Sequence, residues 1–429
     1  MLRLAADIAP TKGTPSPMHP SQNTHAESIA DQLISLAQGQ GIRPWKLNGK
    51  TLVPVVQGGM GVGVSASGLA GSVARLGAMG TLSSVDLRRR HPDLMAITED
   101  AHLKPNGREL MDAANREALT REIHLARDLA EGRGLIAVNV MKALSAYEQY
   151  VETALAAGVD ALVVGAGLPL DLPDLAKNFP QTALIPILSD ARGVQLVIKK
   201  WEKKGRLPDA IVIEHPRLAG GHLGAAKVAD LNDQRFEFSE VIPAVRAFLE
   251  TAGYSKEIPL IAAGGISSQE DILRLQALGC SAVQLGTAFA VTKESDAAAT
   301  FKSVLAGAKP EDIVEFVSVA GLPARAVRTP WLDKYLRIEE KLKAVAHAKR
   351  KGCNLALDCL AHCGLRDGQP TMGQFCIDRQ LGYAMEGEEN KGLFFRGAGR
   401  LPFGDQIRSV EDLMRRLLTG DDSPASAAA

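Results

Sequence analysis

The amino-acid sequence predicts an α/β protein with a (β/α)8 barrel, and three observations indicate this fold class. Eight short apolar runs occur between residues 52 and 285, and helical segments separate most of them. Several runs are apolar on consecutive residues, as in Ala210-Ile-Val-Ile213, which indicates parallel strands buried on both faces. Eight strand–helix units over about 240 residues match the size of such a barrel. A doubly wound sheet is the competing architecture, because periodicity does not exclude it.

The expected strands follow one another along the chain. They are Leu52–Val56, Ala78–Ser83, Leu135–Val140, Ala161–Val164, Ala183–Leu188, Ala210–Ile213, Leu260–Ala263 and Ala282–Leu285. Apolar residues at helical spacing follow the first strand at Leu69, Val73 and Leu76, and a helix is expected over Gln269–Leu278 after the seventh.

The remaining segments predict the domain organisation. The long connection Asp86–Gly134 contains an amphipathic helical pattern over Arg116–Leu129, so we expect an inserted helical segment that forms a lid or a second small lobe. A flexible tail and lead-in helix are expected over residues 1–44, the barrel over 45–335, and a helical, cysteine-containing extension over 336–420. Residues 421–429 are expected to be a disordered end.

Composition and charge suit an enzyme and disfavour two classes of partner. Of the 429 residues, 46% are hydrophobic and 23% are charged, as in an ordinary α/β protein. Lys+Arg and Asp+Glu both number 49, so the formal net charge is zero and a nucleic-acid partner is disfavoured. No apolar run approaches the roughly 20 residues of a membrane span. The first 26 residues lack the apolar segment of a secretory signal, and the five cysteines fit a reducing cytoplasm. We expect a cytoplasmic enzyme with a small-molecule substrate, with a homo-oligomer left open.

Two strand ends predict a phosphate site. The seventh strand is followed by Gly264 and Gly265, and the eighth by Gly286 and Thr287. Peptide N–H groups without side chains, followed by a helix N-terminus, allow a phosphate to approach closely. In a (β/α)8 barrel such a site lies after strands seven and eight. The alternative is two strand-to-helix turns that merely need glycine.

A second glycine-rich segment, Gln57-Gly-Gly-Met-Gly-Val-Gly-Val-Ser65, follows the first strand. It contains no lysine and lacks the G-x-G-x-x-G order, so it is neither a Walker loop nor a dinucleotide fingerprint. We interpret it as a loop on which a flat ring rests, and a flexible turn is the alternative. Asn139, in the third strand, could contact the edge of the ring or cap the next helix.

The sixth strand leads into Glu214-His-Pro-Arg-Leu-Ala-Gly-Gly-His-Leu-Gly224, which contains the main catalytic candidate. Two glycines before His222 let the backbone approach a ligand while the imidazole faces the mouth of the barrel. Histidine suits proton transfer because its unperturbed pKa lies near working pH. We predict that His222 is catalytic or contacts the ligand, with a structural role as the alternative. His215 is a weaker candidate, because a proline follows it and no glycine frees its surroundings.

Four cysteines follow the predicted barrel in a C-x5-C-x3-C-x12-C pattern. Cys353, Cys359, Cys363 and Cys376 could ligate a [4Fe–4S] cluster or zinc. The C-x2-C pairs of common metal sites are absent, and the alternative is four free thiols in a helical extension. Cys280 is expected on the seventh helix as a packing residue.

Five motifs occur in order along the chain: Gln57-Gly-Gly-Met60, Val138-Asn139-Val140, Gly220-Gly221-His222, Ala263-Gly264-Gly265-Ile266 and Gln284-Leu-Gly-Thr-Ala-Phe289. Together they resemble the nitronate monooxygenase family, also called 2-nitropropane dioxygenases, whose close relatives are the FMN-dependent enoyl-acyl-carrier-protein reductases. Thr292-Lys-Glu-Ser295 and Gly321-Leu-Pro-Ala-Arg-Ala-Val-Arg328 resemble the segment that follows the eighth strand in that family. The resemblance covers residues 45 to 335.

The resemblance implies a TIM barrel that holds FMN and oxidises alkyl nitronates with oxygen. The phosphate would lie on Gly264, Gly265, Gly286 and Thr287. The isoalloxazine ring would lie by Gly58, Gly59, Met60 and Asn139, with Glu214, Gly221 and Gln284 nearby. His222 would position or deprotonate the nitro compound. A branch of the family has similar C-terminal cysteines, and a cluster near FMN would favour a reductase over a simple oxygenase.

Two motifs depart from the family pattern. Family members commonly have Glu-Ala-Gly-Gly-His where this chain has Arg217-Leu-Ala-Gly-Gly-His222, and proline or alanine is usual where Gln57-Gly-Gly-Met60 has glycine. The change in front of His222 is expected to affect which substrate binds more than the binding of the flavin. The alternatives are an NAD(P)H-dependent enoyl-thioester reductase, in which His222 would protonate carbon, and a non-catalytic flavin-binding redox sensor. An RNA-modifying flavoenzyme is disfavoured by the neutral charge.

Overall fold

The computed structural model describes residues 28–254, 258–346, 353 and 359–423. Residues 1–27 of the expected tail and residues 424–429 of the expected end lie outside the described residues. None of the helices in the described ranges combines the length and apolar character that a membrane crossing needs.

Eight parallel strands close into a barrel, which confirms the predicted fold class. In chain order they are β3 (Val55–Gln57), β4 (Met79–Ser83), β5 (Leu135–Met141), β6 (Ala161–Gly165), β7 (Ala183–Leu188), β8 (Ile211–Glu214), β10 (Leu260–Ala263) and β11 (Ala282–Leu285). The barrel closes where β11 pairs with β3, with Val283 opposite Val55. The strands are apolar on both faces because alternate residues face the barrel interior and the surrounding helices: Val212 faces the interior, whereas Ile211 and Ile213 face the helices.

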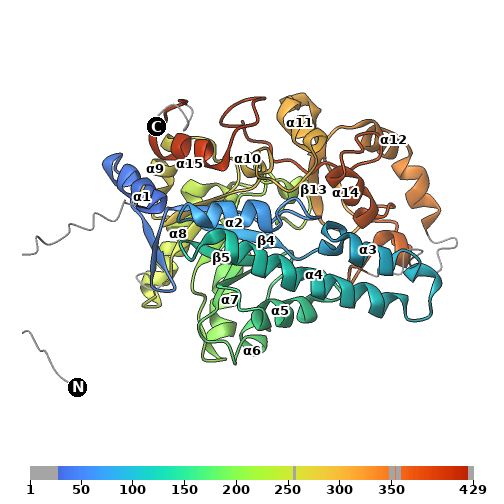
Figure 1. Cartoon of the computed structure of the whole chain (residues 1–429), viewed down its shortest axis with the longest axis horizontal. Coiled ribbons are helices and arrows are strands. Elements are labelled where there is room, and N and C mark those ends of the chain that lie inside the picture. Colours follow the sequence, from blue (N-terminus) through green and yellow to red (C-terminus); the bar gives the residue numbers. More distant parts are fainter. Residues whose placement is uncertain (1–27, 255–257, 347–352, 354–358, 424–429) are drawn as a thin grey trace, which may run out of the picture.

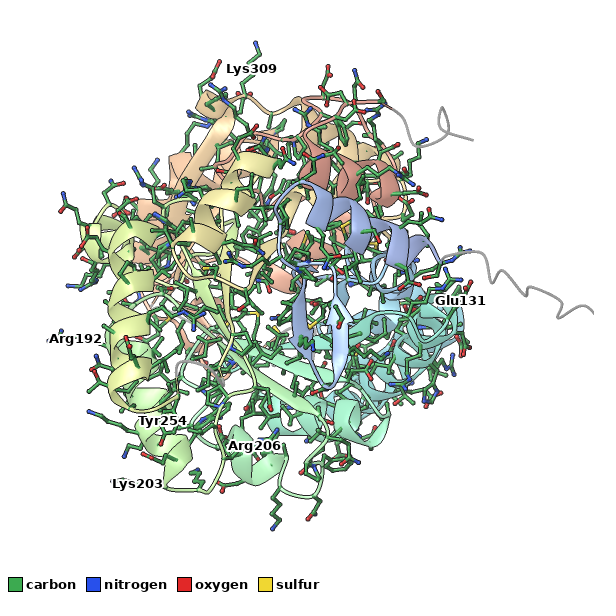
Figure 2. All side chains as sticks on the ribbon, turned by 90° about the vertical axis from the view of Figure 1, so that its left-hand side faces the viewer. Glu131, Arg192, Lys203, Arg206, Tyr254 and Lys309 are labelled. Atoms are coloured by element: carbon green, nitrogen blue, oxygen red, sulfur yellow. The ribbon has the colours of Figure 1, made fainter. Side chains whose placement is uncertain are left out.

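The first strand begins later than the sequence predicted. Leu52 belongs instead to β2 (Lys50–Leu52), which pairs with β1 (Trp45–Leu47) in an antiparallel hairpin. Asn48 and Gly49 form the hairpin turn with positive φ angles of 49° and 74°, a conformation that this residue pair favours. Trp45 and Leu52 pack into the same buried cluster as the barrel interior, so the hairpin covers one end of the barrel. It faces the viewer in blue in Figure 2.

Helices surround the barrel in a ring (Figure 1). They are α2 (Ser67–Arg75), α4 (Gly107–Ala130), α5 (Tyr147–Ala156), α6 (Leu172–Leu175), α7 (Ala191–Glu202), α8 (Phe238–Thr251) and α9 (Gln269–Ala277). The amphipathic part of the predicted insertion lies within α4, which packs against α2 and α5. This helix is therefore a member of the ring rather than a separate lobe. Cys280 is buried, as expected of a packing residue. It lies just beyond the end of α9 rather than on the helix.

The ring is completed by a helix from the far end of the chain. α15 (Val410–Thr419) packs against α9 and α2, and also against α1 (Ile29–Gly39). Ser409 and Asp412 form a capping box at its start, and Leu413, Met414 and Leu417 are buried. The C-terminal extension thus supplies the eighth ring position, because the chain after β11 forms only the short helix α10 (Thr287–Ala290) there.

The other segments gather largely at the carboxyl ends of the barrel strands. They include α3 (Pro92–Thr98), α11 (Ala299–Gly307), α12 (Pro330–Ala344), α13 (Gly364–Asp367), α14 (Ile377–Met385) and the 3-10 helices Leu87–Arg90, Ala101–Leu103, Val228–Asp230, Gln234–Phe236 and Pro310–Asp312. A three-stranded antiparallel sheet joins β12 (Ile313–Val317), β13 (Pro323–Val327) and β9 (Gly221–His222) in that order. Arg89 binds Asp86 and, at 3.0 Å, Asp378, which ties the loop after β4 to α14.

Candidate active site

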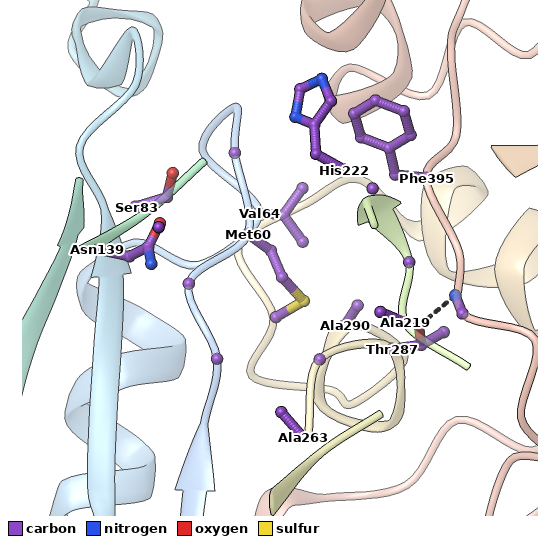
Figure 3. A pocket seen from close by; sticks show the side chains of 18 of the residues that line it. Met60, Val64, Ser83, Asn139, Ala219, His222, Ala263, Thr287, Ala290 and Phe395 are labelled. Atoms are coloured by element: carbon purple, nitrogen blue, oxygen red, sulfur yellow. Dashed lines mark hydrogen bonds between the residues drawn. The ribbon is translucent and has the colours of Figure 1, made fainter. Parts of the chain in front are cut away.

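A single cavity at the carboxyl ends of the barrel strands contains the predicted catalytic and cofactor-binding residues. Its lining includes all twelve of them: Gly58, Gly59, Met60, Asn139, Glu214, Gly221, His222, Gly264, Gly265, Gln284, Gly286 and Thr287. Figure 3 shows Ser83 and Asn139 opposite His222 and Phe395, with Met60 between them. The structure therefore brings together residues that lie up to 229 positions apart in the sequence.

The glycine loop after β3 lies against Asn139. A Cβ atom added to Gly59 would lie 2.3 Å from the Cβ atom of Asn139, so a side chain at this position would displace the loop. Gln57 links the end of β3 to the middle of β4, because its side chain accepts from Thr81 N at 2.9 Å and donates to Thr81 O at 3.1 Å. These contacts hold the loop as a defined wall of the cavity, which favours the binding-loop interpretation over a flexible turn.

Asp296 holds both the end of the same loop and the start of α2, and its N–H donates to Val64 O in the loop at 3.2 Å. Its carboxylate accepts hydrogen bonds from Ala66 N at 2.9 Å and Leu69 N at 3.0 Å, at the start of α2. Asp296 directly follows Thr292-Lys-Glu-Ser295, the segment that resembled the family after the eighth strand. That segment therefore acts on the site through the backbone of the glycine loop.

Bare peptide forms the opposite end of the cavity. Gly264 and Gly265 have φ angles of +109° and +73°, a backbone region that favours glycine. A Cβ atom on Gly265 would also lie 2.7 Å from Cδ1 of Leu218, whereas one on Gly286 would meet only the side chain of Met60 across the cavity, at 3.7 Å. The two strand ends that predicted a phosphate site thus expose main chain to one cavity.

His222 reaches the cavity from β9, at the edge of the small sheet. Its Nε2 atom lies 3.0 Å from the hydroxyl oxygen of the buried residue Ser318. Its ring makes an edge contact with Phe395, with a centroid distance of 5.7 Å. Burial lowers the pKa of His222 to about 4, so its imidazole is neutral at neutral pH.

The position of β9 depends on Arg325. β13 pairs Ala324 with His222 and Arg325 with Gly221. The buried guanidinium of Arg325 donates to Pro216 O at 3.2 Å and also to Ala219 O, and it pairs with Glu315. The motif Gly321–Arg328 therefore positions the segment that carries His222.

The structure settles two alternatives that the sequence left open. Asn139 lies inside β5, and the N-cap of the next helix is Ala146, so the helix-capping interpretation of Asn139 is wrong. His215 is buried outside the cavity lining, with its Nε2 atom 3.3 Å from Glu237 Oε2 and its ring against Phe238. His215 is therefore a packing residue, as its weaker ranking suggested.

Two polar groups in the cavity show that its lining suits a flavin. The Oε1 atom of Gln284 is buried and has no hydrogen-bond partner among the described residues, so it is free to accept from a ring N–H. Burial raises the pKa of Glu214 to about 7, and its carboxyl is largely protonated below that pH. A protonated carboxyl can donate as well as accept at the edge of a ring.

The raised pKa of Glu214 predicts how pH affects the flavin-free protein. Between pH 4.5 and about 7 the folded protein holds a proton there that the unfolded chain has lost. The resulting stabilisation is complete below pH 4.5 and disappears as pH rises through about 7, a change of up to about 3 kcal/mol. We expect Glu214→Gln to remove this loss, measured by urea unfolding of both proteins from about pH 5 to about pH 8. Parallel stability curves for the two proteins would contradict it.

The sequence did not predict the residues that the C-terminal extension adds to the cavity. These are Cys359, Leu360, Ile377, Asp378, Leu381, Ala384, Leu393, Phe395, Gly397, Gly399, Arg400 and Leu401. Most are apolar, and isolated apolar residues carry no local signal of a binding site. The one available signal was the glycine pair within Arg396-Gly-Ala-Gly-Arg400.

The four C-terminal cysteines do not form a recognisable metal centre in the structure. Cys359 lines the cavity, and its thiol pKa is raised well above the usual value by burial, then by Asp378 and the other three cysteines. Among the described residues, no group of three or more His, Cys, Asp or Glu side chains is arranged to hold a metal ion. Residues 354–358, between Cys353 and Cys359, lie outside the described ranges. The [4Fe–4S] or zinc site therefore stays a prediction, and these residues as placed do not fit it.

Comparison with known proteins gives the family. The model of the nitronate monooxygenase family matches residues 45–420, which is most of the chain. The chain belongs to the nitronate monooxygenase family. Membership places it among flavin-dependent oxidoreductases and confirms the resemblance found in the motifs.

Individual relatives agree with this assignment. The chain is 26% identical to a probable nitronate monooxygenase of Bacillus subtilis, over 67% of this chain and 79% of the relative. It is 28% identical to one of Staphylococcus saprophyticus, but that match spans only 31% of this chain and 36% of the relative. Two solved structures share the fold. FabK from Thermotoga maritima has a TM-score of 0.57 and 21% identity, covering 90% of this chain and 94% of FabK. Nitroalkane oxidase from Streptomyces ansochromogenes has a TM-score of 0.55 and 19% identity, covering 88% and 97%.

Proposed function

We propose that the protein oxidises alkyl nitronates with oxygen at an FMN bound in the cavity. The residues that would hold the phosphate are Gly264, Gly265, Gly286 and Thr287. Those that would hold the ring are Gly58, Gly59, Met60 and Asn139, with Glu214, Gly221 and Gln284 nearby. The exposed main chain at both strand ends and the unpartnered oxygen of Gln284 support this assignment. When bound, FMN supplies the transfer of electrons from the nitronate to oxygen.

The choice between nitronate oxidation and enoyl-thioester reduction rests on the protonation state of His222. With a pKa of about 4, its imidazole accepts a proton or a hydrogen bond at neutral pH, but it holds few protons to give away. Deprotonating or positioning a nitro compound needs an acceptor of this kind. An enoyl-thioester reductase in which His222 protonates carbon needs the imidazolium form, which burial disfavours. The neutral state of this imidazole therefore favours the nitronate oxidation over the reductase.

The apolar walls of the cavity would exclude water from the reacting atoms. Val62, Val64 and Leu144 line it from the barrel loops, and Leu381 and Phe395 line it from the C-terminal extension. A buried, apolar enclosure strengthens the hydrogen bonds made inside it and limits side reactions of the bound substrate. His222 lines the same cavity and its partner Ser318 is buried, so the imidazole would act on a substrate that contacts these apolar walls.

Two assays on the purified, flavin-loaded protein test this proposal. We expect oxygen uptake when an alkyl nitronate is added, and no NADH or NADPH oxidation when an enoyl thioester is added. Nicotinamide oxidation that depends on the thioester, without oxygen uptake on nitronate, would establish the reductase instead. Bound flavin with no turnover in either assay would favour a redox sensor.

A separate measurement tests the cysteine-bound cluster, through which no step of the proposed reaction passes. Protein purified without oxygen can be analysed for iron and acid-labile sulfide, and for absorption beyond the flavin bands. A Cys359→Ser variant is the comparison, because it removes one of the four candidate ligands. Iron and sulfide in the wild-type protein that are lost in the variant would support the cluster, and their absence from the wild-type protein would refute it.

A further inference from the structure

The segment 395–401 lies across the glycine-rich end of the cavity. Gly397 N donates to the hydroxyl of Thr287 at 3.0 Å, a bond drawn in Figure 3. A Cβ atom on Gly399 would lie 3.0 Å from Cα of Gly265, and one on Gly220 would lie 2.5 Å from Gly397 N. The segment therefore packs directly onto the peptides that are proposed to hold the phosphate.

Arg396 holds this segment in place. Its buried guanidinium donates to Gly397 O at 2.8 Å and to Leu305 O at 2.9 Å, and also to Gly399 O at 3.3 Å. Phe395, immediately before it, forms a β-bridge with Ala326 of β13. The backbone that leads to Arg400 is thus fixed at several points, so the location of Arg400 follows from packing rather than from a free loop.

Arg400 is distinguished by its charge and by its lack of a partner. It is the only Lys or Arg among the described residues that line the cavity. Two acidic residues also line the cavity and could neutralise its charge. Glu214 is largely neutral below pH 7, and Asp378 already pairs with Arg89. Arg400 makes no hydrogen bond or ion pair with any residue in the described part of the chain, and its side chain is exposed. The cavity therefore contains one uncompensated cation, at the residue that follows Gly399, which packs against Gly265.

We propose that Arg400 binds the phosphate group of FMN and closes the phosphate site from the C-terminal side. A guanidinium presents several N–H donors in a plane that matches the oxygens of a phosphate. The glycine peptides supply N–H groups but no full positive charge, and Arg400 supplies the charge that a phosphate dianion requires. This proposal rests on the proposed FMN site, and it assigns a binding role to a part of the chain that lies outside the barrel.

The proposal is tested by comparing FMN with riboflavin, which has the same ring but no phosphate. Dissociation constants are measured by flavin fluorescence for the full-length chain stripped of flavin. We expect Arg400→Gln to weaken FMN about tenfold and to leave riboflavin unchanged within about twofold. Arg400→Lys should recover part of the lost FMN affinity. Raising the salt concentration should reduce the difference in FMN affinity between the wild-type protein and Arg400→Gln. The matched control is Arg192→Gln, which changes an exposed arginine of α7 at the edge of the molecule (Figure 2) and should affect neither flavin.

Three results would overturn the assignment. An equal loss of affinity for FMN and riboflavin would show that Arg400 acts only on the folding of the segment. Unchanged FMN affinity would show that Arg400 does not reach the phosphate. A wild-type chain that binds neither FMN nor riboflavin would overturn the proposed FMN site as well. This outcome differs from the first two, which concern only the role of Arg400.

Discussion

The His222→Gln variant is expected to turn over a neutral nitroalkane, which must lose a proton to become the nitronate, at least about 100-fold more slowly than the wild-type protein at neutral pH, while FMN stays bound. The side chain removed is the imidazole in the cavity, whose Nε2 atom lies 3.0 Å from Ser318 Oγ and whose pKa is lowered to about 4 by burial. Glutamine can fill similar space and form hydrogen bonds, but it cannot take up a proton. The flavin should remain because the glycine peptides at the barrel strand ends are untouched.

Steady-state oxygen uptake and the flavin absorption of the purified variant measure the two parts of this prediction. For the wild-type protein, kcat/KM should fall on the acid side only as pH approaches about 4, because the neutral imidazole persists down to that value. The variant should lack this dependence. His102→Gln is the control, since His102 is exposed on the 3-10 helix Ala101–Leu103 and lies outside the cavity. Wild-type turnover by the His222→Gln variant would show that His222 takes no part in the reaction.

The Gly286→Asp variant is expected to bind FMN at least about 100-fold more weakly than the wild-type protein, or not at all. A side chain at Gly286 would point across the cavity toward Met60, into the space beside Gly264 and Gly265. The aspartate would both occupy the phosphate position and place a like charge against the phosphate, an arrangement that costs several kcal/mol. The barrel itself should survive, because the added Cβ atom has no neighbour closer than 3.7 Å.

Flavin retained through purification, and flavin affinity after reconstitution, measure this effect, while circular dichroism reports whether the variant is folded. Gly307→Asp provides the matched control, because Gly307 ends α11 and a Cβ atom there would have no neighbour within 4 Å. If Gly286→Asp bound FMN with wild-type affinity, the phosphate would not lie at the end of β11. Loss of folding in both variants would indicate a general intolerance of aspartate rather than a binding site.

The sequence predicted the barrel and the proposed site because both depend on local patterns. An apolar run such as Ala210-Ile-Val-Ile213 indicates a buried strand, and the carboxyl ends of all parallel strands in a barrel meet at one edge. Residues that directly follow such runs, like Gly264 and Gly286, therefore lie together whatever their separation along the chain. His222 was predicted from the two glycines before it, in the segment that follows the sixth strand, although its position on a separate strand that pairs with β13 was not foreseen.

The local pattern failed where a neighbouring residue interrupts it. Leu52 is apolar and adjoins the run that forms β3, yet Pro54 cannot donate to a ladder and Asn48-Gly49 turns the chain back. The strand was consequently predicted to start too early. Recognising the Asn-Gly turn would have separated the hairpin from the barrel.

By itself the sequence determined the barrel and its glycine-lined strand ends, and it singled out His222 as the catalytic candidate, since each of these follows from residues adjacent in the chain. Only the tertiary structure decided where the described part of the C-terminal extension lies. It placed α15 in the eighth position of the helix ring, joined Asp378 to Arg89, and brought Cys359 and Arg400 to the cavity. These contacts join segments far apart in the chain through side-chain packing and charge pairing. No local periodicity encodes such pairings, so they become visible only when the chain has folded back on itself.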